Sequence, residues 1–144
     1  HISTQVKKAN KRFYHVRCLR KLHVNPRIIS LFFNSVVSSV LLYSVACWFN
    51  SLTEKNKKEV SKLSRKVKKM ISPEFHHLVD NPATVHLNQC LSLANRIISD
   101  SSHPLHQFFN VLPSGQRLNM IYTKTDRSHN AFVATAIRLY NCSV

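Results

Sequence analysis

The run from Ile28 to Phe49, IISLFFNSVVSSVLLYSVACWF, constrains the fold of this chain more than any other stretch. Its 22 residues include no Lys, Arg, Asp, Glu, His, Gly or Pro. Asn25-Pro26 stands just before it, and this pair suits the start of a helix because Asn is a good N-cap and Pro is pre-set for the first turn. We therefore predict a central apolar helix over 28–49.

Two environments suit such a helix. Its length meets the rule for a membrane span, and its composition also suits a helix buried on most of its faces by its neighbours. Five serines and Asn34 interrupt the run. The segments on both sides are basic, so there is no charge asymmetry to orient a span. These features favour the buried helix, and a single-span membrane-associated protein with basic flanks is the alternative.

The charge of the chain predicts a polyanionic partner. The 144 residues suffice for a modest core, and they carry 21 Lys and Arg against six Asp and Glu, a net charge of +15. Nucleic acid is the first expectation and an anionic membrane surface the second. Residues 1–72 hold 16 of the basic residues and two acidic ones, whereas residues 73–144 hold five and four. We therefore predict a basic helical bundle over 1–72 and a helical C-terminal extension over 73–144.

Two basic amphipathic helices are predicted on either side of the apolar run. In residues 2–23 an apolar stripe recurs every three to four positions, and a second stripe follows the N-cap Thr53 as far as Ile71. Lysines and arginines cover the other faces. Like charges three or four residues apart repel in an isolated helix, and an anion laid along them relieves that repulsion.

Phosphate groups are the anion that these helices suit best. Each Lys or Arg near a phosphate releases a counterion, so binding should weaken as salt rises. No aromatic residue interleaves the lysines of the second basic helix, which favours contact with the nucleic-acid backbone over sequence reading. The residues expected to make these contacts are Lys7, Lys8, Lys11, Arg12, Arg17, Arg20, Lys21, Lys58, Lys62, Arg65, Lys66 and Lys69.

The C-terminal half reads as helices joined by loops. Residues 73–81 form a connector that contains His76 and His77, and Asn81-Pro82 opens a helix that reaches about Ile98. We then expect a short helical turn near 105–109 and a turn on the only glycine, Gly115. The chain continues with a loose polar stretch over 116–127 and a helix over 130–140. The expected fold is an all-α small helical bundle around the central helix, with a loosely packed C-terminal extension.

Several kinds of chemistry have no support in the sequence. The four cysteines are spaced as separate reduced thiols and fit no zinc motif. The six acidic residues lie too far apart in sequence to suggest a two-cation site for phosphoryl transfer. A chain with one glycine cannot form a glycine-rich phosphate loop. We expect no metal and no cofactor, and the chain is not expected to be an enzyme by itself.

Short motifs along nearly the whole chain resemble the C-terminal end of a non-LTR (LINE-type) retrotransposon reverse transcriptase. They are VKKANKRFY at 6–14, LRKL at 19–22, LFFNSVV at 31–37, CWF at 47–49, SSHPLH at 101–106, LPSG at 112–115, TKTDR at 123–127 and AIRLYN at 136–141. Their order and spacing carry the resemblance. It implies that the fingers and the palm, with the metal-binding aspartates, precede His1, and that this chain is a fragment containing the thumb and the region after it. In that family the thumb holds the template–primer duplex by its RNA or DNA backbone, and the full-length parent is an RNA-directed DNA polymerase.

Some positions depart from the family pattern. The family usually has charged residues near Asn34 and Ser38, a glycine where His23 stands, and a stretch rich in Arg and Lys after Gly115. These departures leave a second alternative, which is that the chain is a non-functional relic of an inactive copy.

Overall fold

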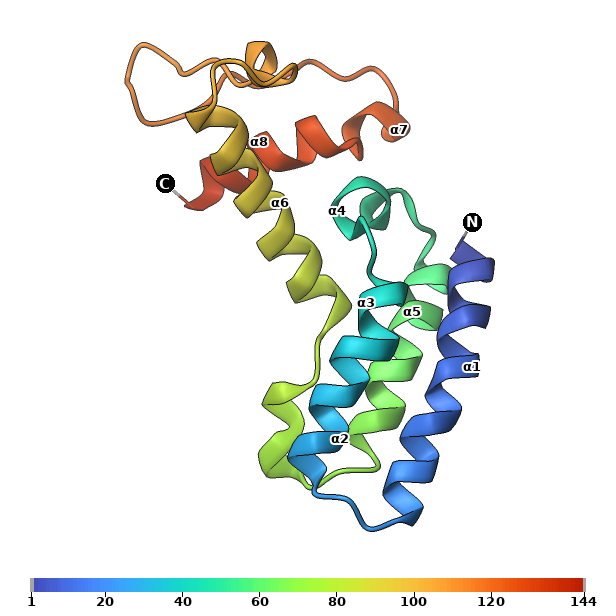
Figure 1. The fold of residues 1–144 in the computed structure, drawn as a ribbon. Helices are drawn as coiled ribbons and strands as arrows, with labels where there is room; N and C mark the ends of the chain where they lie inside the picture. Colours follow the sequence, from blue (N-terminus) through green and yellow to red (C-terminus); the bar gives the residue numbers. More distant parts are fainter. Residues whose placement is uncertain (1, 144) are drawn as a thin grey trace. The chain divides into compact units, whose positions relative to one another are not determined.

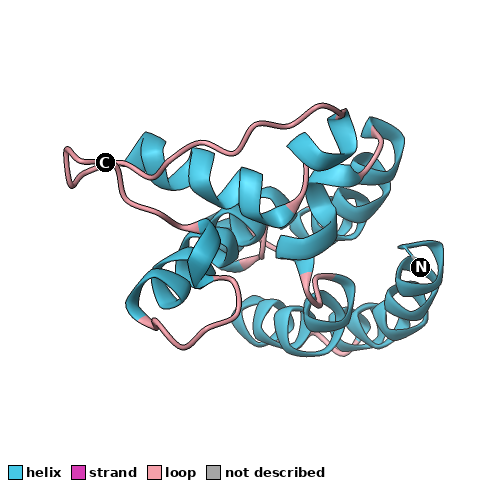
Figure 2. Ribbon diagram, turned by 90° about the horizontal axis from the view of Figure 1, so that it is seen from above, coloured by secondary structure: helices cyan, strands magenta, loops and turns pink. Residues whose placement is uncertain are grey.

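The structure, a computed structural model, describes residues 2–143, and the all-α prediction is confirmed. These residues form helices and loops, apart from one isolated antiparallel bridge between Val111 and Leu118 (Figure 2). The elements are α1 (Ile2–Lys21), α2 (Pro26–Phe32), the π-helix η1 (Phe33–Ser38), α3 (Ser39–Leu41), α4 (Val45–Trp48), η2 (Phe49–Ser51), α5 (Glu54–Lys68), η3 (Pro73–Leu78), α6 (Pro82–Ser99), η4 (His106–Phe108), α7 (Asp126–His129) and α8 (Phe132–Ser143).

The chain divides into two compact units, and each is assembled from two stretches. The N-terminal unit comprises His1–Tyr43 and Leu52–Val85, and the C-terminal unit comprises Ser44–Ser51 and His86–Val144. The division therefore falls near residue 85 and not at residue 72, as we expected from charge. The connector belongs to the N-terminal unit because the half-buried Asn34 side chain donates to the Leu78 carbonyl (2.6 Å) and accepts from the Asp80 N–H (3.2 Å).

Three helical rods make the N-terminal unit. In Figure 1, α1 and α5 run in the same direction, and the continuous rod α2–η1–α3 runs opposite to both. The predicted apolar stripes meet in the core, where Phe13 packs edge-on against Phe33 at 6.4 Å between ring centroids. Ala9 and Val16 of α1, and Val60, Leu63 and Val67 of α5, are buried in the same core.

The prediction of one uninterrupted helix over 28–49 is wrong. The helical rod ends at Leu41, and α4 begins only at Val45, after Ser44 in the left-handed conformation with φ of 51°. No glycine or proline marks this break in the sequence. Val45 and Phe49 are buried in the C-terminal unit. The packing of these apolar side chains in another core therefore overrides the continuous helical pattern.

The rod α2–η1–α3 is buried on one side and not on most of its faces. Phe33 and Val37 are fully buried, but Ile28 and Leu31 are 53% and 55% exposed. Over the part of the chain that the structure describes, no individual helix has the length and apolar character to cross a membrane; the segments before and after the break meet that test only when combined.

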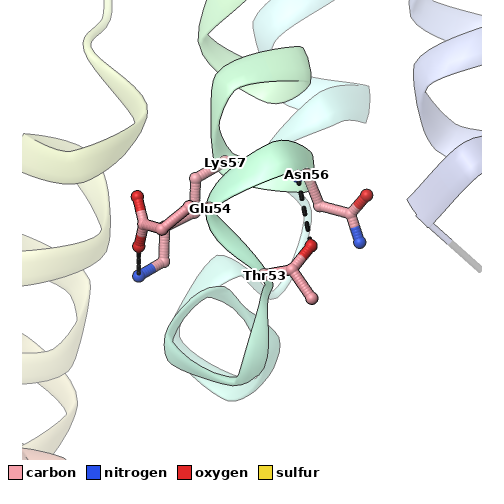
Figure 3. Close-up of polar contacts among 4 residues, drawn as sticks. All are labelled: Thr53, Glu54, Asn56 and Lys57. Carbon is pink, nitrogen blue, oxygen red and sulfur yellow. Dashed lines mark hydrogen bonds and ion pairs between the residues drawn. The ribbon is translucent and has the colours of Figure 1, made fainter.

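The predicted N-caps form as expected. The Asn25 side chain accepts from the Arg27 N–H at 2.9 Å, and the Asn81 side chain accepts from the Ala83 N–H at 3.2 Å. At the start of α5 the Thr53 hydroxyl accepts from the Asn56 N–H at 3.4 Å (Figure 3). These bonds satisfy N–H groups that have no partner inside the helix.

The C-terminal unit has a core of its own, which the sequence pattern did not predict. Ala94, Ile97, Phe109, Leu118, Ala136 and Ile137 are buried together there. The Asn141 side chain of α8 holds the loop that contains Leu118. It accepts from the Leu118 N–H (2.8 Å) and donates to the Leu118 carbonyl (3.0 Å). The expected turn is present: Gly115, with φ of 74°, donates to the Leu112 carbonyl at 2.8 Å. The C-terminal part is thus a packed unit and not a loose extension.

Candidate nucleic-acid interface

Five basic side chains form one continuous face of α5. Their positions follow intervals of three, four, three and four residues, which keeps them on one side of a helix. The buried stripe of Val60, Leu63 and Val67 lies on the opposite side. All five are exposed, and at 1.5 Å per residue they extend over about 21 Å. We call this set, Lys55, Lys58, Lys62, Arg65 and Lys69, the α5 basic face.

The α5 basic face forms no ion pair, although the carboxylate of Glu59 lies beside it. Within residues 2–143 the structure contains one ion pair, between Lys57 and Glu54 at 2.9 Å, and it lies off this face (Figure 3). Arg65 donates to the Lys58 carbonyl at 3.1 Å, which holds its guanidinium along the helix. The mutual repulsion of these charges is therefore offset by few carboxylates and by no direct ion pair.

The basic residues of α1 separate onto two sides of the helix. Lys8 and Arg12 line a hollow of about 280 Å³ against α3, together with Tyr43, and Arg12 also donates to the Val36 carbonyl at 3.0 Å. Lys7 lies on the side that meets α5. The structure therefore does not bring all the predicted α1 contacts together.

The remaining predicted residues of α1 fall in three places. Arg17 lies over the Phe13 ring at 5.5 Å, on the side of α5. Lys11 is exposed on the outer side of the helix, and Arg20 and Lys21 are exposed in its last turn. Every predicted contact residue except the half-buried Lys66 is exposed.

A groove runs between the parallel helices α1 and α5. Its volume is about 290 Å³. Lys66, at the groove wall, lies 6.0 Å from the centroid of the Phe13 ring, the same ring that Arg17 approaches. Cation–π attraction to the Phe13 ring favours the position of each of these two cations. We call this feature the α1–α5 groove, and it is lined by Ser3, Val6, Lys7, Asn10, Glu59, Lys62, Leu63 and Lys66.

Sequence reasoning missed three residues of this surface. Lys55 belongs to the α5 basic face, and Glu59 places a carboxylate inside the groove. Tyr14 is 63% exposed on α1, and its hydrogen bond with the Cys18 thiol raises the pKa of the Tyr14 hydroxyl. The seven-residue interval from Lys7 to Tyr14 was the available signal, because it places both residues on one side of the helix.

The histidines of the connector have a structural contact. The His76 ring donates from Nε2 to the Lys68 carbonyl at 2.6 Å, and this bond ties η3 to the last turn of α5. In the described part of the chain, His, Cys, Asp and Glu side chains form no group of three or more that could hold a metal ion.

The C-terminal unit carries little charge. It has five basic and two acidic residues, against 16 and four in the N-terminal unit. A buried polar contact in this unit joins the Cys90 thiol to His86 Nε2, at 3.4 Å. The electrostatic asymmetry of the sequence therefore places the candidate interface on the N-terminal unit.

Comparisons of the chain with protein-family models, with curated proteins and with solved structures found no match. The resemblance to reverse transcriptases and the roles of the basic residues therefore stay predictions.

Proposed function

We propose that the N-terminal unit binds the sugar-phosphate backbone of RNA or DNA without reading its sequence. The observation that carries this proposal is the α5 basic face: five exposed cations on one side of a helix, none of them paired with a carboxylate. A phosphate backbone supplies a row of negative charges to such a face and releases condensed counterions on binding.

The chemistry of the face suits backbone contact better than base recognition. Lysine dominates it, and lysine is a point charge on a flexible stem that meets phosphate from many directions. The face has no aromatic residue on which a base stacks and no Asn or Gln to read a base edge. The expected binding is therefore non-specific.

The sequence motifs support a more specific version of this proposal. In it, the chain is the thumb-like region of a non-LTR retrotransposon reverse transcriptase and holds the template–primer duplex for a palm that lies upstream. Polymerisation belongs to the parent enzyme in this proposal, and the chain contributes its grip on nucleic acid.

Salt-dependent binding tests the proposal directly. Fluorescence anisotropy with a labelled duplex of arbitrary sequence, between about 50 and 200 mM salt, should show log K falling linearly with log salt. Five phosphate contacts predict a slope of about −4 to −5, at roughly 0.9 per contact. Binding that is insensitive to salt, or differs strongly between unrelated sequences, contradicts the proposal.

A charge-matched pair of variants locates the contact. Replacing Lys58, Lys62, Arg65 and Lys69 by Gln should lower the steepness of the slope by about three to four. The control replaces the same number of cations in the C-terminal unit, Arg96, Arg117, Lys124 and Arg127, and should retain most of the slope. Equal losses in both variants would show that only the net charge matters.

A further inference from the structure

We infer that the α1–α5 groove holds one nucleic-acid strand, and that Tyr14 stacks on a base of that strand. This inference rests on the proposed function and narrows it, because it assigns a path to the backbone and adds a contact with a base. The groove's volume of about 290 Å³ lies just below the range for small-molecule pockets, roughly 300–1,000 Å³. A space of that size suits a nucleotide of a single strand and is too small for a duplex.

Cations line the groove from both helices. Lys7 projects from α1, and Lys62 and Lys66 project from α5. All three line the same hollow, Lys7 from its α1 wall and Lys62 and Lys66 from its α5 wall. A phosphate chain that follows the groove therefore has lysines on both sides, whereas a chain on the outer side of α5 meets cations from one helix only.

Tyr14 lies on the same side of α1 as the groove residue Lys7, two turns further along the helix and outside the groove lining. It lies seven residues after Lys7 and seven before Lys21, so these three residues share one side of the helix. The Tyr14 ring is 63% exposed, and it meets the His15 ring edge-on at 5.8 Å. An exposed aromatic ring between two cations is the combination that single-strand binding proteins use, since any base can stack on the ring while the cations hold phosphates.

Glu59 provides the sharpest test. Its side chain lines the groove beside Lys62 and Lys66 and forms no ion pair. A carboxylate there repels a phosphate chain in the groove, so Glu59→Gln should tighten binding of a single-stranded oligonucleotide by about two- to fivefold at low salt. Glu74→Gln is the control, because it removes the same charge from an exposed site in η3 of the same unit. Equal effects from both variants would overturn the groove as the path.

Tyr14 is tested by a pair of substitutions in the intact chain. Tyr14→Ala should weaken single-strand binding about fivefold or more, and Tyr14→Phe should retain the affinity because stacking needs the ring and not the hydroxyl. Tyr122→Ala, which removes an exposed tyrosine of the C-terminal unit, is the control and should have no effect. Circular dichroism of each variant verifies that the helices remain.

The outcomes separate this inference from the proposed function. If neither single strands nor duplexes bind, the proposed function fails. If the α5 basic face variant loses binding while Tyr14→Ala and Glu59→Gln bind single strands like the parent, the inference is overturned and the proposed function stands. Loss with Tyr14→Ala, retention with Tyr14→Phe and a gain with Glu59→Gln support the inference.

Discussion

At the scale of single residues, His23 adopts a conformation that favours glycine. Its φ is 53°, in the left-handed region, and the chain closes over α1 with a bond from the Val24 N–H to the Leu19 carbonyl at 3.2 Å. Glycine is the usual residue at this position of a helix C-terminus because it has no Cβ to strain. The backbone at His23 is thus of a kind that glycine adopts with less strain than histidine.

We expect His23→Gly to raise the free energy of unfolding by about 1 kcal/mol. Denaturant unfolding monitored by circular dichroism measures it. Lys11→Gly, at an exposed position inside the same helix, is the control and should lower the free energy of unfolding by about 1 kcal/mol. A loss of stability in both variants contradicts the prediction.

Cys90 is expected to be inert in the folded protein. It is fully buried, and burial raises the pKa of its thiol to about 11. Cys47 and Cys142 are exposed. A thiol-specific reagent at neutral pH should therefore label these two first and Cys90 only after unfolding, as mass spectrometry of labelled peptides will show. Labelling of Cys90 at the rate of Cys142 contradicts the packing of this core.

The raised pKa of Cys90 also predicts a pH dependence. The folded state keeps the thiol protonated, whereas the unfolded state loses the proton at the ordinary value of 9.0. The contribution of this group to stability is complete below pH 9 and is lost as pH rises towards about 11. Cys90→Ala should flatten this part of the stability profile, as measured by denaturant unfolding over that range.

At the scale of elements, α5 has a well-capped N-terminus and a set of cations that repel one another. Thr53 and Glu54 stabilise its N-terminus, but its cations repel one another. Salt screens that repulsion. We expect the melting temperature of the free protein to rise with added sodium chloride over the same range in which nucleic-acid binding weakens. Differential scanning fluorimetry tests this, and a melting temperature that falls with salt would contradict it.

Local signals predicted helix starts well and helix interruptions poorly. Asn25, Thr53 and Asn81 act through bonds to N–H groups two or three residues away, so the sequence alone reveals them. The break at Ser44 and the π-helix η1 have no such signal. They depend on which core each apolar side chain enters, and this choice involves residues far away in the chain.

The candidate interface was predictable from the sequence only in part. Helical periodicity alone places Lys58, Lys62 and Lys69 on one face of α5. It cannot tell which side of α1 meets α5, so Lys7 and Lys8 looked equivalent in the sequence although they line different hollows. Tyr14 gained its significance only from the groove beside it.

At the scale of the whole molecule, the two cores predict separate responses to mutation. Ile97 is 3% exposed in the core of the C-terminal unit, and Ile97→Ala should destabilise that unit by about 2–5 kcal/mol. Amide hydrogen exchange should then accelerate in α8 while α1 stays protected. Leu63→Ala in the N-terminal core is the reciprocal control. Unprotected amides throughout the parent protein would instead favour the relic alternative.

The division into units shows where charge misleads. The net charge changes sharply after residue 72, yet Val79 is buried and Asn34 holds the connector by two hydrogen bonds. The distribution of charge predicts which surface faces a charged partner, whereas the boundary of a compact unit depends on buried contacts. The residue at which the charge changes therefore need not be the boundary.

The interleaving of the two units affects how the protein is made. Ser44–Ser51 is synthesised before its packing partners, which begin at His86 and include Thr135, whose hydroxyl accepts from the Asn50 side chain at 2.9 Å. At about 5–20 residues per second, roughly 4 to 17 s pass between the synthesis of Ser51 and that of Thr135. During that interval Val45 and Phe49 lack the later part of their own unit, so the nascent chain exposes an apolar segment to chaperones until α8 has been synthesised.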